Sequence, residues 1–307
     1  MMFVAPGCGA DSKAEKDTAQ GDTAKTDAGM KADQEEGVLP LFDGHSHFMP
    51  SWDLESLPDL VNDHGTLGMV LLGAGPTFKL QKDQPTIFLA SAHVKINTEL
   101  EETQDELFAD LIEQLDGGAR GIGELSIRHF ATKPGSPDTY WDFNHPFLIK
   151  VYDEANKRGV PVNFHFDYDA GPLDTLTDTL PLYPDVTFIW AHSGDTTPEN
   201  LEPFLLAHPN LNLDVSCRNS LEAFGNRPFP PQVIRMDDGN GVIQEGWKDL
   251  LEAYPDRVLF GSDVGPPGRL EIYAQILAYY RGIFSQLSPE IAAKVGHENA
   301  MRIYQMP

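Results

Sequence analysis

VLPLFDGHSH, residues 38–47, joins a short apolar run to two histidines that stand one residue apart. On a β-strand, residues i and i+2 point to the same face, so His45 and His47 would project side by side from one strand end. Two neutral imidazoles placed in this way can bind the same metal ion. A solvated His-Ser-His turn explains the pair equally well, so other parts of the chain must distinguish the two interpretations.

Seven further runs along the chain are apolar at nearly every residue. They are GMVLLGAG (68–75), TIFLASAH (86–93), ARGIGELSI (119–127), GVPVNFHFD (159–167), VTFIWAHSG (186–194), LNLDVSC (211–217) and RVLFGSDV (257–264). Runs of this kind are typical of strands that are buried on both faces of a parallel sheet.

Amphipathic segments separate several of these runs. A capping box at residues 103–106 predicts the start of one helix, and Ser288 followed by Pro289 predicts the start of the last one. Eight buried strands that alternate with helices over about 265 residues match a (β/α)₈ TIM barrel. A doubly wound open sheet is the alternative, but the chain lacks the glycine-rich phosphate loop typical of that fold.

The first 37 residues differ from the rest. Most of them are Ala, Lys, Asp, Thr and Gly, which predicts a disordered tail and places the folded domain at residues 38–307. Residues 4–8 resemble the end of a bacterial lipoprotein signal, although most of a signal peptide is missing. The segment predicts either a cell-envelope lipoprotein, tethered to a membrane through a lipid on Cys8, or a cytoplasmic protein.

Composition excludes several classes of protein. The formal net charge of the 307 residues is -25, which repels phosphate backbones and argues against a nucleic-acid partner. No apolar stretch reaches the 18 residues that a membrane span needs. The two cysteines, Cys8 and Cys217, lie in the tail and in the domain, so a disulfide framework is not expected.

Metal-ligand side chains stand at or near the ends of five predicted strands. In a (β/α)₈ barrel the catalytic groups lie at the carboxyl ends of the strands. The residues in question are His45 and His47 on the first strand, Glu124 on the fourth, His165 on the fifth, His192 on the sixth and Asp263 on the eighth. Each alone has an ordinary structural explanation, such as a helix cap or a hydrogen-bonded core histidine. Six of them at one edge of one barrel predict a metal site.

Three further polar residues follow strand ends. Arg128 and His129 follow the fourth strand and Arg218 follows the seventh, so we predict that they contact the substrate. Arginine there would suit a carboxylate, while pairing with this chain's many acidic residues is the alternative. The segment 218–245 is long for a βα loop and is predicted to cover the mouth of the site.

Six motifs, taken in order, resemble the amidohydrolase superfamily of metal-dependent hydrolases, and within it the amidohydrolase-related (type 2) branch. They are DGHSH, GIGEL, NFHFD, WAHSG, LFGSD and GHENAMRIY, and the resemblance covers residues 39–307. It implies a (β/α)₈ barrel that holds one or two divalent metal ions, zinc above all.

The resemblance also implies roles for single residues. His45, His47 and His165 would be metal ligands, and Asp263 would hold the metal and accept a proton from its water. His192 would be either a ligand of a second ion or a general acid. Many two-metal members carry a carboxylated lysine on strand four. Glu124 stands there instead, which is similar to the TatD-like deoxyribonuclease branch.

Several functions are compatible with this resemblance. The first is hydrolysis of an ester, lactone or amide bond of a small molecule by a metal-activated water. Similar one-metal members decarboxylate aromatic or unsaturated acids, and a TatD-like nuclease and a non-enzymatic binding barrel are further alternatives. The strong negative charge disfavours the nuclease. Two ions bridged by Glu124 would favour hydrolysis, while a single ion would make decarboxylation equally plausible.

Overall fold

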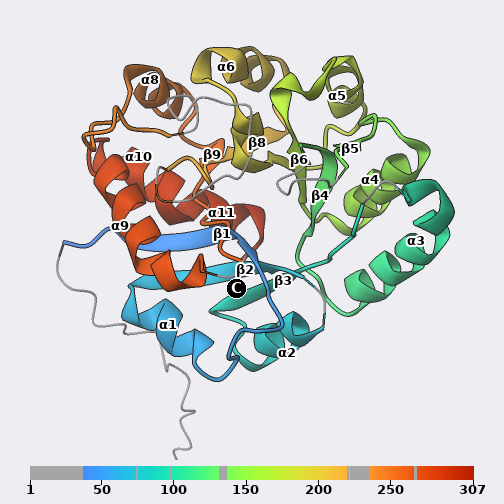
Figure 1. Ribbon diagram of the computed structural model, residues 1–307, viewed down its shortest axis with the longest axis horizontal. Coiled ribbons are helices and arrows are strands. Elements are labelled where there is room, and N and C mark those ends of the chain that lie inside the picture. The colour runs from blue at the N-terminus through green and yellow to red at the C-terminus, as the bar shows by residue number, and fades with distance from the viewer. Residues whose placement is uncertain are drawn as a thin grey trace, which may run out of the picture. The chain divides into compact units, whose positions relative to one another are not determined.

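Eight parallel strands alternate with helices along the chain (Figure 1). The computed structural model describes residues 37–73, 75–96, 99–130, 137–219, 221, 235–265 and 268–307. The parallel strands are β1 (Leu41–His47), β2 (Thr66–Leu72), β3 (Phe88–Ser91), β4 (Ile122–His129), β6 (Val162–Phe166), β7 (Phe188–Trp190), β8 (Leu211–Asp214) and β9 (Val258–Leu259). Each strand overlaps one of the eight apolar runs of the sequence, although β2 begins two residues before its run and β4 ends two residues after its run.

The eight strands form two sheets, and two residue pairs between the sheets close them into a barrel. The strand order is β1-β2-β3 in one sheet and β4-β6-β7-β8-β9 in the other, with the short antiparallel β5 (Thr139–Tyr140) beside β4. Ala92, after β3, pairs with Ile122 of β4, and Ser46 of β1 pairs with Val264, after β9. The predicted (β/α)₈ barrel is therefore confirmed, and the open sheet is excluded.

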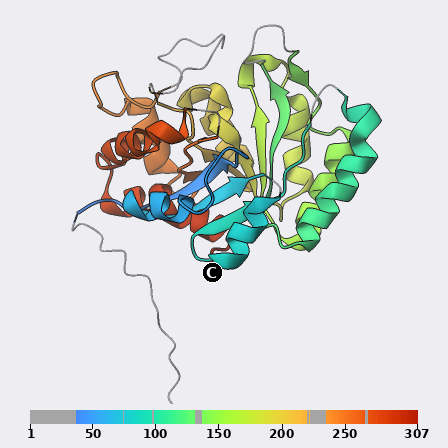
Figure 2. The ribbon, with the colours of Figure 1, turned by 60° about the horizontal axis from the view of Figure 1, so that its bottom comes forward.

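Helices surround the strands on the outside (Figures 1 and 2). They are α1 (Leu57–Asp63), α2 (Pro76–Asp83), α3 (Leu100–Asp116), α4 (Pro146–Arg158), α5 (Asp174–Thr179), α6 (Pro198–Ala207), α8 (Glu245–Ala253), α9 (Tyr273–Phe284), α10 (Pro289–Ala293) and α11 (Asn299–Ile303). None of these described helices has the length and apolar character needed to cross a bilayer.

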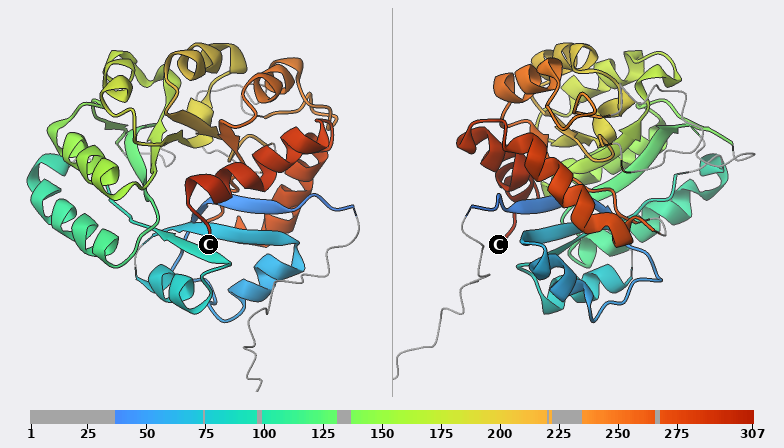
Figure 3. Two further views of the ribbon diagram at one scale, coloured as in Figure 1. Left: turned by 180° about the vertical axis from the view of Figure 1, so that it is seen from behind. Right: turned by 60° about the vertical axis from the view of Figure 1, so that its left-hand side comes forward.

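Helix α11 closes the amino-terminal end of the barrel. Ala300, Ile303 and Tyr304 pack with inward-facing apolar residues of the strands, such as Phe42 and Val70, in one buried cluster. The end of the chain consequently lies beside the first strands (Figure 3). The GHENAMRIY motif thus forms the apolar floor, which leaves the carboxyl end of the barrel for polar side chains.

Two predicted helix starts had different outcomes. Ser288 caps α10, because its side chain accepts a hydrogen bond from the Ile291 amide, as predicted. The helix start predicted from the capping box at residues 103–106 is wrong. Helix α3 already begins at Leu100, and the Thr103 hydroxyl donates to the Glu99 carbonyl 3.0 Å away inside the first turn. A threonine can bond back to the preceding turn as well as cap a new one.

Some predictions concern residues that the structure does not describe. Cys8 and the rest of the tail up to residue 36 lie outside the described residues, as do residue 220 and residues 222–234 of the predicted covering loop. The tail, the lipid tether and the loop's role over the site stay predictions.

Asp43 joins β1 to the segment after β9, directly below the polar end of the barrel. It is fully buried, and its Oδ1 accepts from the amides of Ser262 at 2.9 Å and His45 at 3.2 Å. Its Oδ2 accepts from the Ser262 hydroxyl at 2.5 Å. Burial raises the pKa of Asp43 from 3.8 to about 6, although these hydrogen bonds oppose the shift.

The elevated pKa of Asp43 predicts a pH-dependent cost to folding. The folded state binds the Asp43 proton more tightly than the unfolded state does. The contribution of Asp43 to the unfolding free energy therefore decreases as pH rises from about 4 to about 6. We expect the unfolding free energy of the wild type to fall by about 3 kcal/mol relative to Asp43→Asn between pH 3.5 and pH 7. Urea unfolding of both proteins tests this, because the other titrating groups cancel in the difference. Parallel pH curves would contradict the prediction.

Candidate metal centre

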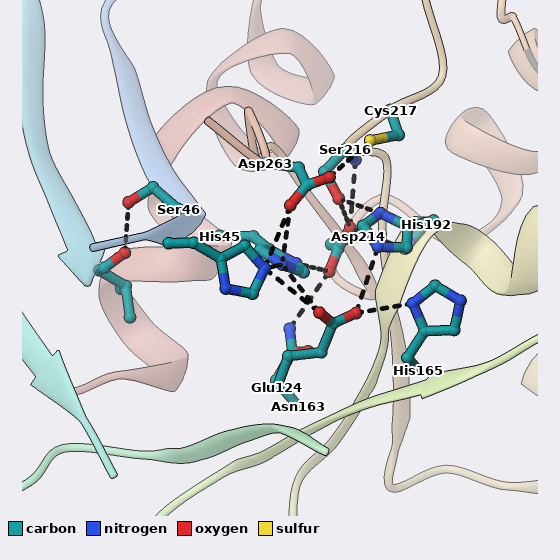
Figure 4. A network of polar contacts seen from close by, with 12 residues as sticks. His45, Ser46, Glu124, Asn163, His165, His192, Asp214, Ser216, Cys217 and Asp263 are labelled. Atoms are coloured by element: carbon teal, nitrogen blue, oxygen red, sulfur yellow. Dashed lines mark hydrogen bonds and ion pairs between the residues drawn. The ribbon is translucent and has the colours of Figure 1, made fainter. Parts of the chain in front are cut away.

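The six predicted metal ligands converge inside the barrel. Figure 4 labels all of them except His47. This six-residue cluster consists of His45 and His47 at the end of β1, Glu124 on β4, His165 on β6, His192 just after β7 and Asp263 after β9. Only His47 is more than slightly exposed, with 26% of its side chain accessible. Residues up to 218 positions apart in the chain therefore share one buried polar site.

Glu124 lies between two pairs of histidines. Its Oε2 is 3.2 Å from His47 Nε2 and 3.8 Å from His45 Nε2. Its Oε1 is 2.9 Å from His165 Nδ1 and 3.2 Å from His192 Nε2. The two oxygens of one carboxylate thus face two separate pairs of imidazole nitrogens.

Close backbone packing explains the glycine that precedes Glu124. Gly123 has φ +130°, and a Cβ at this position would overlap the Asn163 carbonyl of the neighbouring strand. Only glycine therefore fits between β4 and β6 at this point. The GIGEL motif places Glu124 in the barrel through this requirement.

Asp263 completes the first histidine pair from the opposite side of the barrel. Its Oδ1 is 3.1 Å from His47 Nε2 and 3.7 Å from His45 Nε2. Its Oδ2 accepts from the Cys217 thiol at 2.8 Å and forms an ion pair with Arg269. One oxygen is thus fixed by the protein, and the other faces the centre of the cluster.

The charges of the cluster favour positive charge at its centre. Burial lowers the pKa of His47, but hydrogen bonds to Asp263 and Glu124 outweigh it and raise that pKa to about 10. The pKa of His165 is raised to about 10 against the same burial effect, by Asp167 and Glu124. A divalent cation would supply positive charge between the same groups.

The donor atoms of the cluster fit a metal ion. Three sets of three ligand atoms lie within 4.8 Å of one another: His45, His47 and Glu124; His45, His192 and Asp263; and Glu124, His165 and His192. Imidazole nitrogens and carboxylate oxygens are ligands for zinc and similar divalent metals. A fourth set, His129, His165 and Asp167, extends outward from His165.

His192 enters the site on a strained turn. His192, Ser193, Gly194 and Asp195 have consecutive φ values of 52°, 49°, 62° and 52°. A left-handed backbone costs a non-glycine residue roughly 1–2 kcal/mol, so neighbouring contacts must hold the turn. At Gly194 an added Cβ would lie 2.7 Å from the Trp190 ring, which explains the glycine of the AHSG motif.

The predicted substrate contacts lie in different surroundings. Arg128 is buried, stacks on Tyr140 and Phe166, and donates to the carbonyls of Trp141 and Pro172. Arg128 also forms an ion pair with Asp142 at 3.1 Å, which is the pairing with an acidic residue that the alternative predicted. Its contact with a substrate stays a prediction.

Arg218 and His129, the other two predicted substrate contacts, also lie in different surroundings. Arg218 is buried, donates to the Thr196 carbonyl and lies over the Trp247 ring. It also forms an ion pair with Asp195 at 3.7 Å, as the alternative predicted, and so supports the turn that carries His192. Its contact with a substrate stays a prediction. The His129 ring packs against His165 with ring centroids 4.0 Å apart and the planes tilted by 37°, so His129 borders the cluster and stays a candidate substrate contact.

Several residues near the cluster were not predicted from the sequence. Asp214 and Asp167 contact His45 and His165 at 2.9 and 3.0 Å, respectively. Asp167 could have been predicted from the sequence, because it stands two residues after His165 and therefore lies on the same face of the strand. His93 ends the third apolar run, and its buried Nδ1 has no hydrogen-bond partner among the described residues.

Comparisons with known proteins agree with this fold. The model of the amidohydrolase family matches residues 99–306. No curated protein matches the chain. Among solved structures, an uncharacterised TIM-barrel protein, Bb4693 from Bordetella bronchiseptica, is 19% identical, with 83% of each chain covered and a TM-score of 0.57.

Two similar structures have names that indicate a reaction. The 2,6-dihydroxybenzoate decarboxylase from Rhizobium is 15% identical over 87% of this chain and 98% of its own, with a TM-score of 0.53. A probable 2-pyrone-4,6-dicarboxylic acid hydrolase from Acinetobacter baumannii is 13% identical over 86% and 99%, with a TM-score of 0.53. These structural likenesses show the fold, and the family match covers more than half of the sequence. The chain therefore belongs to the amidohydrolase family of metal-dependent enzymes.

Proposed function

We propose that this protein hydrolyses an ester, lactone or amide bond of a small molecule at a site for two divalent metal ions. The observation that carries the proposal is the position of Glu124. Its Oε2 faces His45 and His47, and its Oε1 faces His165 and His192. A carboxylate that faces two ligand pairs in this way is suited to bridge two ions.

The residues of the cluster divide between the two ion positions. His45, His47 and Asp263 would hold the first ion, and His165 and His192 the second. We propose zinc for both, because four of the six ligands are imidazoles, which suit zinc better than magnesium or calcium. When bound, such ions supply a nucleophilic water at neutral pH and polarise the bond that is attacked.

Asp263 has the contacts expected of a proton acceptor. The Cys217 thiol and Arg269 hold its Oδ2, so rotation of the carboxylate is restricted. Burial opposes ionisation, but His47 and Arg269 keep the pKa of Asp263 well below its usual range. Its Oδ1 therefore stays ionised, faces the first ion position, and can orient an attacking water and accept its proton.

Decarboxylation of an aromatic or unsaturated acid is the second candidate function. The observation that favours it is Arg269, which forms an ion pair with Asp263 at the edge of the cluster while 18% of its side chain stays accessible. A cation in this position could also recognise a substrate carboxylate. In that reaction one ion would suffice and His192 would be free to donate a proton.

The number of bound ions distinguishes these functions. We expect elemental analysis of protein purified without chelator to give about two ions per chain. The His45→Ala/His47→Ala variant should retain at most about one, because it loses two ligands of the first ion. The matched control is His64→Ala, whose ring packs on Tyr273 outside the cluster, and it should keep both ions.

Activity assays complete this test. Wild-type protein is offered a panel of aryl esters, lactones and amides, and aromatic acids with detection of released carbon dioxide. Hydrolysis together with two ions supports the proposal. One ion and carbon dioxide release would instead establish decarboxylation. Absence of metal, with no gain on adding zinc or manganese, would contradict both functions.

A further inference from the structure

Asp214, at the end of β8, lies behind the six-residue cluster and contacts two of its histidines. Its side chain is fully buried, and Figure 4 shows it between His45 and His192. Neither histidine is its neighbour in sequence, since Asp214 follows His192 by 22 residues and His45 by 169. A carboxylate in such a position is costly to bury unless its partners compensate.

The Oδ2 atom of Asp214 fixes the ring of His45. It lies 2.9 Å from His45 Nδ1, and Asn163 Nδ2 donates to the same oxygen at 3.2 Å. A carboxylate oxygen accepts from an N–H group, so the 2.9 Å contact assigns the shared proton to Nδ1 of His45. The Nε2 lone pair of His45 is then directed at the metal position, 3.2 Å from His47 Nε2.

The Oδ1 atom of Asp214 holds the strained turn. It accepts from the His192 amide at 3.0 Å and the Ser216 amide at 3.1 Å. The Ser216 hydroxyl also donates to it, and lies 2.8 Å from His192 Nδ1. The backbone carbonyl of Asp214 accepts from the Ser193 hydroxyl at 2.7 Å. These contacts hold both the backbone and the ring of His192 in place.

We propose that Asp214 is a positioning residue that links the two ion positions. One of its oxygens fixes the tautomer of His45 at the first position, and the other fixes the left-handed turn that presents His192 at the second. The inference rests on the proposed two-ion function. It assigns Asp214 no contact with substrate or metal.

Replacement of Asp214 by asparagine separates these two roles. The amide oxygen should remain with the two backbone N–H groups of His192 and Ser216, because the amide nitrogen cannot accept from them. The nitrogen of the amide then donates to His45 Nδ1. That forces the proton of His45 onto Nε2, where it blocks metal binding.

Alanine at the same position acts differently. Asp214→Ala removes the support of the turn and leaves buried N–H groups unpaired, which should destabilise the fold. It does not force the wrong tautomer on His45, so part of the population still presents Nε2 to the metal. The two variants should therefore rank in opposite orders for stability and for zinc affinity.

Zinc competition titration and thermal unfolding in chelator test this ranking. We expect the more weakly bound zinc ion of Asp214→Asn to have an affinity about 10–100-fold lower than the corresponding ion of the wild type. This affinity should also be lower than in Asp214→Ala. In chelator, Asp214→Asn should melt at a higher temperature than Asp214→Ala. Ser216→Ala, which touches only the His192 side, should leave the ion held by His45 unaffected. Asn163→Ala is the control for loss of a neighbouring hydrogen bond and should keep both ions.

The possible results are distinguishable. Wild-type zinc affinity in Asp214→Asn, while the wild type holds two ions, would overturn the positioning role and leave the proposed function intact. A zinc affinity that decreases in the same order as the melting temperature across the variants would also overturn the positioning role and leave the proposed function intact. A wild type that binds no ion would overturn the proposed function and this inference together. If Asp214→Ala does not fold, the comparison of Asp214→Asn with Ser216→Ala still decides the role.

Discussion

Replacing Asp263 by asparagine is expected to lower the rate of hydrolysis by about 10³-fold or more while the protein stays folded. The amide keeps the size of the side chain but cannot accept a proton from water. Asparagine also tolerates the left-handed backbone that Asp263 adopts, with φ 53°. The measurement is kcat/KM on whichever substrate of the panel is hydrolysed, with metal content and melting temperature determined on the same sample.

A neighbouring variant controls for disturbance of this carboxylate. Cys217→Ala removes one hydrogen bond to Asp263 Oδ2 but leaves the carboxylate and its ion pair with Arg269. We expect a decrease in kcat/KM of less than about tenfold, the size of one lost hydrogen bond. If Asp263→Asn keeps full metal content and more than a tenth of wild-type kcat, another group accepts the proton.

The barrel and its six-residue cluster could be predicted because both follow from local patterns. Strands buried on both faces are apolar at nearly every residue, and eight such runs leave few architectures. Parallel strands then bring their carboxyl ends to one edge, so His45 and Asp263 meet there despite their distance in sequence. The ends of the runs supplied most of these residues, whereas Glu124 lies inside its run, as the third residue of β4.

The partners of single side chains could not be predicted in the same way. Arg128 lies near the end of β4 and Arg218 follows β8, as substrate contacts would. In the structure, acidic side chains, aromatic rings and backbone carbonyls from other segments engage them. Asp214 sits inside an apolar run, and nothing in LNLDVSC indicates that it faces His45. Such contacts depend on three-dimensional packing between strands, which no local period encodes.

Replacing Glu124 by glutamine is expected to reduce bound metal from about two ions to about one and to lower hydrolysis by about 10³-fold or more. Glutamine offers one accepting oxygen and no charge, so it can serve only one of the two histidine pairs. Its amide nitrogen would face the other pair, where ligand nitrogens lie within 3.8 Å of the present carboxylate. Elemental analysis and kcat/KM on the same preparations measure both effects.

Two comparisons show whether bridging is the reason. Glu113 lies on α3, and Glu113→Gln changes the net charge by the same amount at a position outside the cluster, so it should keep both ions and full activity. Glu124→Asp keeps the charge but shortens the side chain, and we expect metal content and activity between those of wild type and Glu124→Gln. If Glu124→Gln retains two ions, the histidine pairs and Asp263 hold them without a bridge. If the wild type itself holds one ion and Glu124→Gln keeps it, Glu124 instead orients the histidines through hydrogen bonds, and the decarboxylase becomes the better candidate.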